Sequence, residues 1–548
     1  MHIVTMILTF FLAVVVSAFV ARLLPGRIPL PLLQIGIGAV LSMFGLGVNF
    51  DSHLFLLLFI PPLLFLDGWR IPKGAFFSDW GSILTLAIGL VVFTVIGLGY
   101  FIDWLVPAMP LAVAFALAAI LSPTDPVAVA TVTANAPLPS RLMHILEGEA
   151  LLNDATGLVC FSFAVAAVLT GGFSFGHAAL SFLFVGGGGV VVGVLVPWSI
   201  GWLNQQLVKR AGEEPGIQIL ISLLIPFAAY LVAERIGVSG ILSAAVAGIA
   251  MHYSELSGRR MAATRMQRAA VWDTVQLVLN GIIFVLLGEQ LPRMLARLPE
   301  VAASLHVHSA WHLGLYAIAI TIALWVLRYV WVWLMFRAVV LFSGWRGASR
   351  DMPSWRLLIV TAAAGVRGAI TLAGILTLPF FLPDHSPFPA RDAAIFLSMA
   401  VILLSLAGAS ICLPLLARGL TLGMSPVAMH KRTAAARIAA AEAAVRTIEV
   451  LGTRTTGNAE LDALRSEASA YLLDLYRRRL SYGDASGDSS SDRSRLADVT
   501  RSLRLKALSA ERDELYRQRL THGIDDDVLR SLVREIDLTE ASLANRED

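Results

Sequence analysis

Long apolar runs separated by short polar segments occupy the chain up to residue 418. A helix needs about 20 apolar residues to cross the hydrocarbon core of a bilayer, and thirteen runs reach or approach that length. We therefore predict an all-α polytopic membrane protein. The predicted spans are 3–24, 28–48, 53–69, 82–105, 110–134, 141–170, 176–204, 216–235, 237–252, 271–290, 309–336, 356–381 and 392–416.

The C-terminal part has a different pattern, in which apolar residues recur at helical spacing among charged ones between 434 and 545. The segment 481–494 is rich in Ser, Gly and Asp, a composition that resists packing. We expect a transmembrane domain at 1–418 and a cytoplasmic helical tail at 419–548, with a flexible linker at 481–494. The tail reads equally as a regulatory or dimer-supporting module and as a solvated helical hairpin.

Lys and Arg in the short loops predict the orientation, because they concentrate on the cytoplasmic side of a membrane. With the N-terminus outside, fifteen lie in inner loops and four in outer loops. Thirteen spans then leave the tail in the cytoplasm. The inner set is Arg22, Arg27, Arg70, Lys73, Arg141, Lys209, Arg210, Arg259, Arg260, Arg265, Arg268, Arg337, Arg346, Arg350 and Arg356, and the outer set is Arg235, Arg293, Arg297 and Arg391.

Composition agrees with the pattern, since 57% of residues are hydrophobic and 15% are charged, against about 25% charged in soluble domains. The net charge of +3 is spread over loops, so no nucleic-acid partner is expected. Cys160 and Cys412 lie inside apolar spans and read as small hydrophobic residues rather than a disulfide. No cofactor is predicted, and His144, near Glu147 and Glu149, is the one histidine worth testing as a pH sensor.

A carboxylate lies where lipid physics disfavours it. Asp154 is near the middle of span 141–170, roughly 20 Å from either end at 1.5 Å per residue. A charge at that depth costs about 2.5–3.5 kcal/mol on insertion scales, and such residues default to ion or proton pathways. Asn153 is its neighbour, and Glu149 shares a face with Asn153. The alternative is a structural Asp, salt-bridged or protonated.

Two spans should be interrupted near their middles. Pro123 and Pro126, within Ser122-Pro-Thr-Asp-Pro126, break a helix because proline removes a donor and clashes with a preceding carbonyl. In 365–370, glycines flank Arg367, which needs a counter-ion. The two spans are the fifth and the twelfth, and an odd shift reverses direction. This predicts two inverted six-helix repeats, spans 1–6 and 8–13, with crossed discontinuous helices.

Three further polar residues lie within or at the ends of apolar spans. Asp67 could line a cytoplasmic funnel or merely reach the interface. We expect Asn280 to form an interhelical hydrogen bond and Arg328 to snorkel towards the membrane surface.

Three motifs together resemble the monovalent cation:proton antiporter family, which contains the bacterial and animal sodium/proton exchangers. They are Thr124-Asp125-Pro126, Glu149-Ala-Leu-Leu-Asn-Asp154 and Gly365-Val-Arg-Gly368, in the family's order and on the expected spans. The resemblance covers most of 1–418. It implies a homodimer whose protomers combine a scaffold part with a moving six-helix core.

The resemblance also implies roles for individual residues. Asp154 would bind a monovalent cation or a proton in alternation, with Asn153 beside it. Thr124 would offer a backbone carbonyl and Asp125 would partner the half-helix ends, while Glu149 and Arg367 would form a structural ion pair. Asp67 would match an acidic residue near the ion. One departure is Ala150, where many members have Ser, which leaves the ligand count and the choice among sodium, lithium and potassium open.

The expected function is secondary active antiport of Na⁺, or Li⁺ or K⁺, against H⁺ across the cell membrane, in the service of pH and sodium homeostasis. Hard cations prefer oxygen ligands, and burial disfavours a charged carboxylate, so cation and proton would compete for Asp154. A single Asn-Asp pair predicts electroneutral one-for-one exchange by alternating access. The alternatives are K⁺/H⁺ antiport, a cation channel or a proton-coupled solute carrier. An enzyme is not expected, because no nucleophile–base or metal-ligand set lies at one depth.

Overall fold

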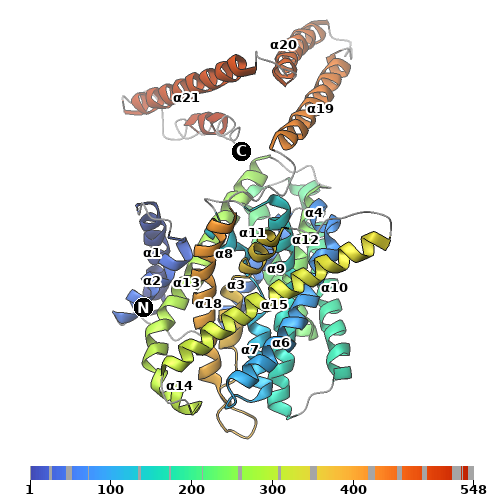
Figure 1. Cartoon of the computed structure of the whole chain (residues 1–548). Helices are drawn as coiled ribbons and strands as arrows, with labels where there is room; N and C mark the ends of the chain where they lie inside the picture. The colour runs from blue at the N-terminus through green and yellow to red at the C-terminus, as the bar shows by residue number, and fades with distance from the viewer. Residues whose placement is uncertain are drawn as a thin grey trace. The chain divides into compact units, whose positions relative to one another are not determined.

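Regular structure in this protein is helical wherever the chain is described, apart from one isolated bridge between Phe381 and Pro387. The structure is a computed structural model (Figure 1). The all-α prediction is confirmed for the residues that the structure describes. They are 2–23, 28–44, 52–71, 73–133, 138–171, 175–212, 214–256, 262–306, 310–345, 354–417, 426–452, 459–483, 490–520, 532–533 and 535–540.

Every one of the thirteen predicted spans contains helix. The long helices are α1 (His2–Leu23), α2 (Leu30–Met43), α3 (Ser52–Arg70), α6 (Val91–Leu105), α9 (Ser140–Thr170), α10 (Phe175–Ala211), α11 (Pro215–Ile236), α12 (Gly240–Leu256), α13 (Ala262–Ala296), α15 (Ala310–Trp345) and α18 (Arg391–Ala417). The short ones include α4 (Lys73–Ser78), α5 (Trp80–Leu84) and α14 (Leu298–Ser304).

Length and composition identify fewer spans than the sequence pattern does. Among the described residues, seven helices are long and apolar enough to cross a membrane, or eight if one bent pair counts as a single span. The chain is thus a multi-span membrane protein, while the count of thirteen stays a prediction. Of the loop cations used to orient it, Arg27, Arg259, Arg260, Arg346 and Arg350 lie outside the described residues.

The bent pair is the predicted interruption of the fifth span. Helix α7 (Leu111–Leu121) and helix α8 (Pro126–Val132) meet at 52° across residues 122–125. The twelfth span is also interrupted, between α16 (Trp355–Ala363) and α17 (Ala369–Leu376). The backbone N–H of Asp125 donates to the carbonyl of Val366 at 2.8 Å, so the two interruptions touch. Both predicted breaks are confirmed.

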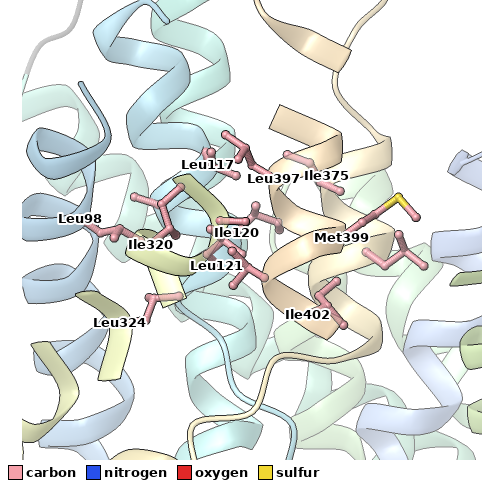
Figure 2. Packing of buried hydrophobic residues seen from close by; sticks show 14 of the residues in the cluster. Leu98, Leu117, Ile120, Leu121, Ile320, Leu324, Ile375, Leu397, Met399 and Ile402 are labelled. Atoms are coloured by element: carbon pink, nitrogen blue, oxygen red, sulfur yellow. The ribbon is translucent and has the colours of Figure 1, made fainter. Parts of the chain in front are cut away.

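A close-packed apolar cluster holds the interrupted helices in place (Figure 2). Because lipid tails are as apolar as Leu, such helices associate through packing rather than through escape from water. The cluster joins α6 and α7 to α15, α17 and α18. Its labelled members are Leu98, Leu117, Ile120, Leu121, Ile320, Leu324, Ile375, Leu397, Met399 and Ile402.

Glycines set the position of α3, the helix that carries Asp67. A Cβ on Gly68 would lie 2.1 Å from the carbonyl oxygen of Ala245, and one on Gly248 would lie 2.0 Å from that of Phe65. Real Cβ atoms do not approach this closely, so α3 and α12 can cross here only because both positions are glycine.

One element was not predicted. Residues Thr85–Leu90 form the π-helix η1 between α5 and α6. Wider turns leave backbone groups for other partners, and the indole Nε1 of Trp331 on α15 donates to the carbonyl of Thr85 at 3.1 Å.

Contacts divide the chain into two units, Met1–Gly423 and Met424–Asp548. The second contains α19 (Pro426–Gly452), α20 (Ala459–Gly483) and α21 (Ser490–Leu520). Within it, Arg512 pairs with Asp537 and Glu540. Of the expected linker 481–494, residues 484–489 lie outside the described part, and the rest is helical.

Candidate functional site

A pocket lies where the two helix interruptions meet α3, α9 and α13. It encloses about 470 Å³ of space, including the part open to solvent. Its polar lining comes from helices far apart in the sequence. The polar residues are Asp67, Thr124, Asp125, Asp154, Asn280 and Thr371.

Asp154 reaches this pocket from the unbroken helix α9 and is only 5% exposed. Among the described residues, no hydrogen bond or ion pair engages its carboxylate. Neighbouring Asn153 is 1% exposed, and its Nδ2 donates to the Thr124 hydroxyl at 3.0 Å and to Glu149 Oε1 at 3.4 Å. Asn153 therefore ties α9 to the break between α7 and α8, while Asp154 is left to the pocket.

Glu149 forms its ion pair with Arg328, so the predicted pair with Arg367 is wrong. Nη1 and Nη2 of Arg328 donate to the two carboxylate oxygens of Glu149 at 2.5 and 2.6 Å. This bidentate geometry is the strong form of such a pair. Arg328 is 2% exposed, and its Nε donates to the carbonyl of Thr361 at 2.9 Å. The snorkelling predicted for Arg328 is therefore wrong as well.

Arg367 instead neutralises a broken helix end. Its Nη1 donates to the carbonyls of Ser122 and Pro123 at 2.7 and 2.9 Å. These carbonyls follow the last turn of α7, where the helix dipole is negative, and a cation is stabilising there. The prolines that free the carbonyls thus also explain where the arginine finds its counter-charge.

Asp125 serves the opposite end of the same break. Its Oδ1 accepts from the backbone N–H groups of Val127 and Ala128 at 2.9 and 3.1 Å, which makes it the N-cap of α8. The other carboxylate oxygen, Oδ2, lies against Gly368 where the two interrupted helices cross. A Cβ on Gly368 would lie 2.0 Å from this oxygen. Gly368 is required for this close approach.

The Thr124 side chain is engaged in the same network. Its hydroxyl accepts from Asn153 and donates to Glu149 Oε1 at 3.4 Å. A ligand role for Thr124 would therefore fall on its backbone carbonyl.

Asp67 lines the pocket, as it would in a funnel, and does not merely reach the interface. The end of α3 that carries Asp67 is held in place by Lys73. Lys73 Nζ donates to the carbonyls of Gly68 and Ile71 at 2.7 and 2.8 Å, capping the end of α3. Sequence reasoning misjudged Asn280, which lies in the pocket and makes no hydrogen bond among the described residues.

Other candidate chemistry is not brought together. Within the described part of the chain, no group of three or more His, Cys, Asp and Glu side chains could hold a metal ion. Cys160 and Cys412 are half-buried and unbridged. His144 does not line the pocket.

Comparisons with known proteins agree on one family. Residues 7–419 match the family model described as sodium/hydrogen exchanger, transmembrane. The uncharacterised Na⁺/H⁺ exchanger YjcE of Escherichia coli is 41% identical over 99% of both chains. The sodium, potassium, lithium and rubidium/H⁺ antiporters of Bacillus pumilus and Bacillus subtilis are each 40% identical over 74% and 76% of this chain, covering 60% and 62% of their own.

A solved structure supports the fold. The sodium proton antiporter MjNhaP1 from Methanocaldococcus jannaschii superposes with a TM-score of 0.58 over 77% of this chain and 99% of its own. Their identity is 18%, so the likeness concerns the architecture alone.

Proposed function

Because the chain belongs to the transmembrane sodium/hydrogen exchanger family, we propose that it is a secondary active antiporter that exchanges Na⁺ for H⁺ at Asp154. One observation carries the proposal. Glu149, Arg367 and Asp125 are each compensated by partners within the protein. The Asp154 carboxylate is buried beside a pocket without such a partner in the described residues.

Charge balance explains why Asp154 would exchange its occupant. An isolated carboxylate in a low-dielectric site is costly unless it is neutralised. A proton does so by covalent attachment, and a hard cation does so through oxygen ligands. Only one of them fits at a time. Asp67, Asp125 and the backbone carbonyl of Thr124 would complete the oxygen shell around the cation, and Asn153 would hold Thr124 in place.

The same balance gives the stoichiometry and the coupling. With either occupant, Asp154 is neutral, and without one it carries a charge that is costly to move through the membrane. If only the neutral forms change their exposure from one side to the other, exchange is one-for-one, electroneutral and driven by the two gradients. Alternating access of this kind is consistent with interrupted helices that cross at the site.

Potassium is the second candidate cation. Relatives at 40% identity bear names that include potassium, lithium and rubidium. By the family resemblance, Ala150 stands where many members have a Ser whose hydroxyl can ligate the cation, so this chain would have one ligand fewer. Both observations favour a site that accepts several monovalent cations.

We also propose the membrane arrangement. The thirteen spans would form two inverted repeats in a homodimer in the cell membrane, with the N-terminus outside. The tail 419–548 would lie in the cytoplasm and regulate exchange. The physiological role would be pH and sodium homeostasis.

Exchange in proteoliposomes tests the function. Purified protein is reconstituted with a pH-sensitive dye inside, and Na⁺, Li⁺ or K⁺ is added outside. We expect the added cation to make the interior of wild-type proteoliposomes more alkaline, because each cation that enters is exchanged for an internal proton. This change should be lost in Asp154→Asn, with unchanged thermal unfolding of the variant. Flux should not depend on an imposed membrane voltage. Exchange that persists in Asp154→Asn would remove this residue from the mechanism.

A further inference from the structure

Helix α13 carries a row of polar residues that the mechanism above does not use. Asp273, Gln276 and Asn280 are spaced three and four residues apart, so they lie on one side of the helix. We refer to these three residues as the α13 stripe. It begins at an exposed residue, since the side chain of Asp273 is 65% exposed, and it ends in the pocket at Asn280.

The α13 stripe faces α3. Nη1 of Arg70 donates to Gln276 Oε1 at 2.5 Å, and Nη2 of Arg70 pairs with Asp273. Arg70 lies three residues after Asp67, so both are on the same side of α3. The contacts of Arg70 therefore set how α3 and α13 are aligned along their lengths, and in this alignment Asp67 and Asn280 line the same pocket.

Asn280 has the surroundings of a ligand rather than of a structural amide. It is half-buried and lines the pocket together with Asp67 and Asp154. Polar side chains inside a membrane protein normally bond to a neighbouring helix, yet this amide makes no hydrogen bond in the part of the chain that the structure describes. The pocket that Asn280 lines is therefore where this amide can find a partner. Whatever occupies the pocket is positioned to satisfy it.

We propose that Asn280 is a cation ligand supplied by α13, and that its amide oxygen helps to set which monovalent cation is taken. The inference rests on the antiport function proposed above. Asp154 lines the pocket from α9 and Asn280 lines it from α13. A neutral oxygen adds coordination without adding charge, so it leaves the one-for-one stoichiometry intact. The number and spacing of oxygens distinguish cations of equal charge.

Transport kinetics test the proposal. Apparent KM values for Na⁺, Li⁺ and K⁺ are measured in proteoliposomes at one pH for the wild type, Asn280→Leu, Asn280→Ala and Asn280→Gln. Leu keeps the branched shape of the side chain and removes the oxygen. We expect Leu and Ala to raise KM about tenfold for the preferred cation, the effect of losing one ligand of moderate strength. The ratios among the three cations should change, and Gln, which keeps a neutral amide oxygen, should restore KM towards the wild type.

A matched control lies on the same helix. Leu277 is 47% exposed and does not line the pocket, so Leu277→Ala should leave all three KM values unchanged. Wild-type KM values in both Leu and Ala variants would overturn the proposal. So would an equal rise for all three cations that Gln fails to correct, since that is the result of a structural role. If Asn280→Leu does not fold, the Ala and Gln variants carry the comparison.

The outcome is separable from the antiport proposal. Loss of exchange in Asp154→Asn, together with wild-type KM values in the Asn280 variants, would support the antiport function and refute only the role of Asn280 as a ligand. Exchange retained in Asp154→Asn would refute the function itself.

Discussion

The ion pair between Glu149 and Arg328 gives a prediction whose magnitude follows from the structure. Both side chains are buried, at 0% and 2% exposure, and two charge-assisted hydrogen bonds join them. Removing one partner leaves the other as an uncompensated charge, which costs about 3–5 kcal/mol of folding free energy. Glu149→Met and Arg328→Met should each destabilise by that amount.

The double variant should be much more stable than the sum of the two losses. With both charges gone, the carbonyl of Thr361, the hydroxyl of Thr124 and the amide of Asn153 each lose one partner, at about 1 kcal/mol apiece. The total of about 3 kcal/mol against about 6–10 kcal/mol for the two single losses implies coupling of at least about 3 kcal/mol.

Equilibrium unfolding in mixed detergent micelles measures this cycle, and Arg367 supplies the control. Arg367 donates to backbone carbonyls rather than to Glu149. Its cycle with Glu149→Met should therefore give weaker coupling than the cycle of Arg328 with Glu149→Met, even if Arg367→Met alone is strongly destabilising. Stronger coupling of Glu149 to Arg367 than to Arg328 would refute this assignment of charge partners.

Two further substitutions probe the crossing and the π-helix. Gly368→Ala should abolish exchange, because its Cβ would overlap the Asp125 carboxylate. The control Gly36→Ala, in open space on α2, should exchange normally. Transport by Gly368→Ala would contradict the close approach of Gly368 to Asp125. Trp331→Phe should lower the free energy of unfolding by about 1 kcal/mol, because it removes the hydrogen bond to Thr85. It should also speed the exchange of backbone amide hydrogens in 85–90. Unchanged amide protection in 85–90 would show that the indole does not hold η1.

Local chemistry explains which parts of the fold could be predicted from the sequence. Length and apolar content located the helices of the membrane unit, because spanning a bilayer constrains both. Pro123 and Pro126 located the break between α7 and α8, since proline acts on its own turn. The π-helix Thr85–Leu90 escaped prediction because the group that donates to the Thr85 carbonyl is the indole of Trp331, more than two hundred residues away.

In the candidate site too, local features could be predicted from the sequence, and contacts between distant residues could not. The depth of Asp154 could be read from residue counts, but the partner of Glu149 could not, since Arg328 lies 179 residues away along the chain. A signal for it existed. Arg328 lies eight residues inside the nearer end of its predicted span 309–336, and the argument that Arg367 needs a counter-charge applied to Arg328 as well. Which side of α13 faces the pocket depends on tertiary packing, so Asn280 was misjudged.

Helix α9 separates two kinds of carboxylate by rotation alone. Glu149 and Asp154 are five residues apart, which places them about 140° from each other around a helix of 3.6 residues per turn. One side meets Arg328, a permanent counter-charge that α15 holds in place. The other side meets the pocket at the crossing of the broken helices. A permanent partner at Asp154 would outcompete a transported ion, so the arginine must be kept on the Glu149 side. By this reasoning, moving the positive charge across α9 would stop exchange as completely as deleting the Asp154 carboxylate.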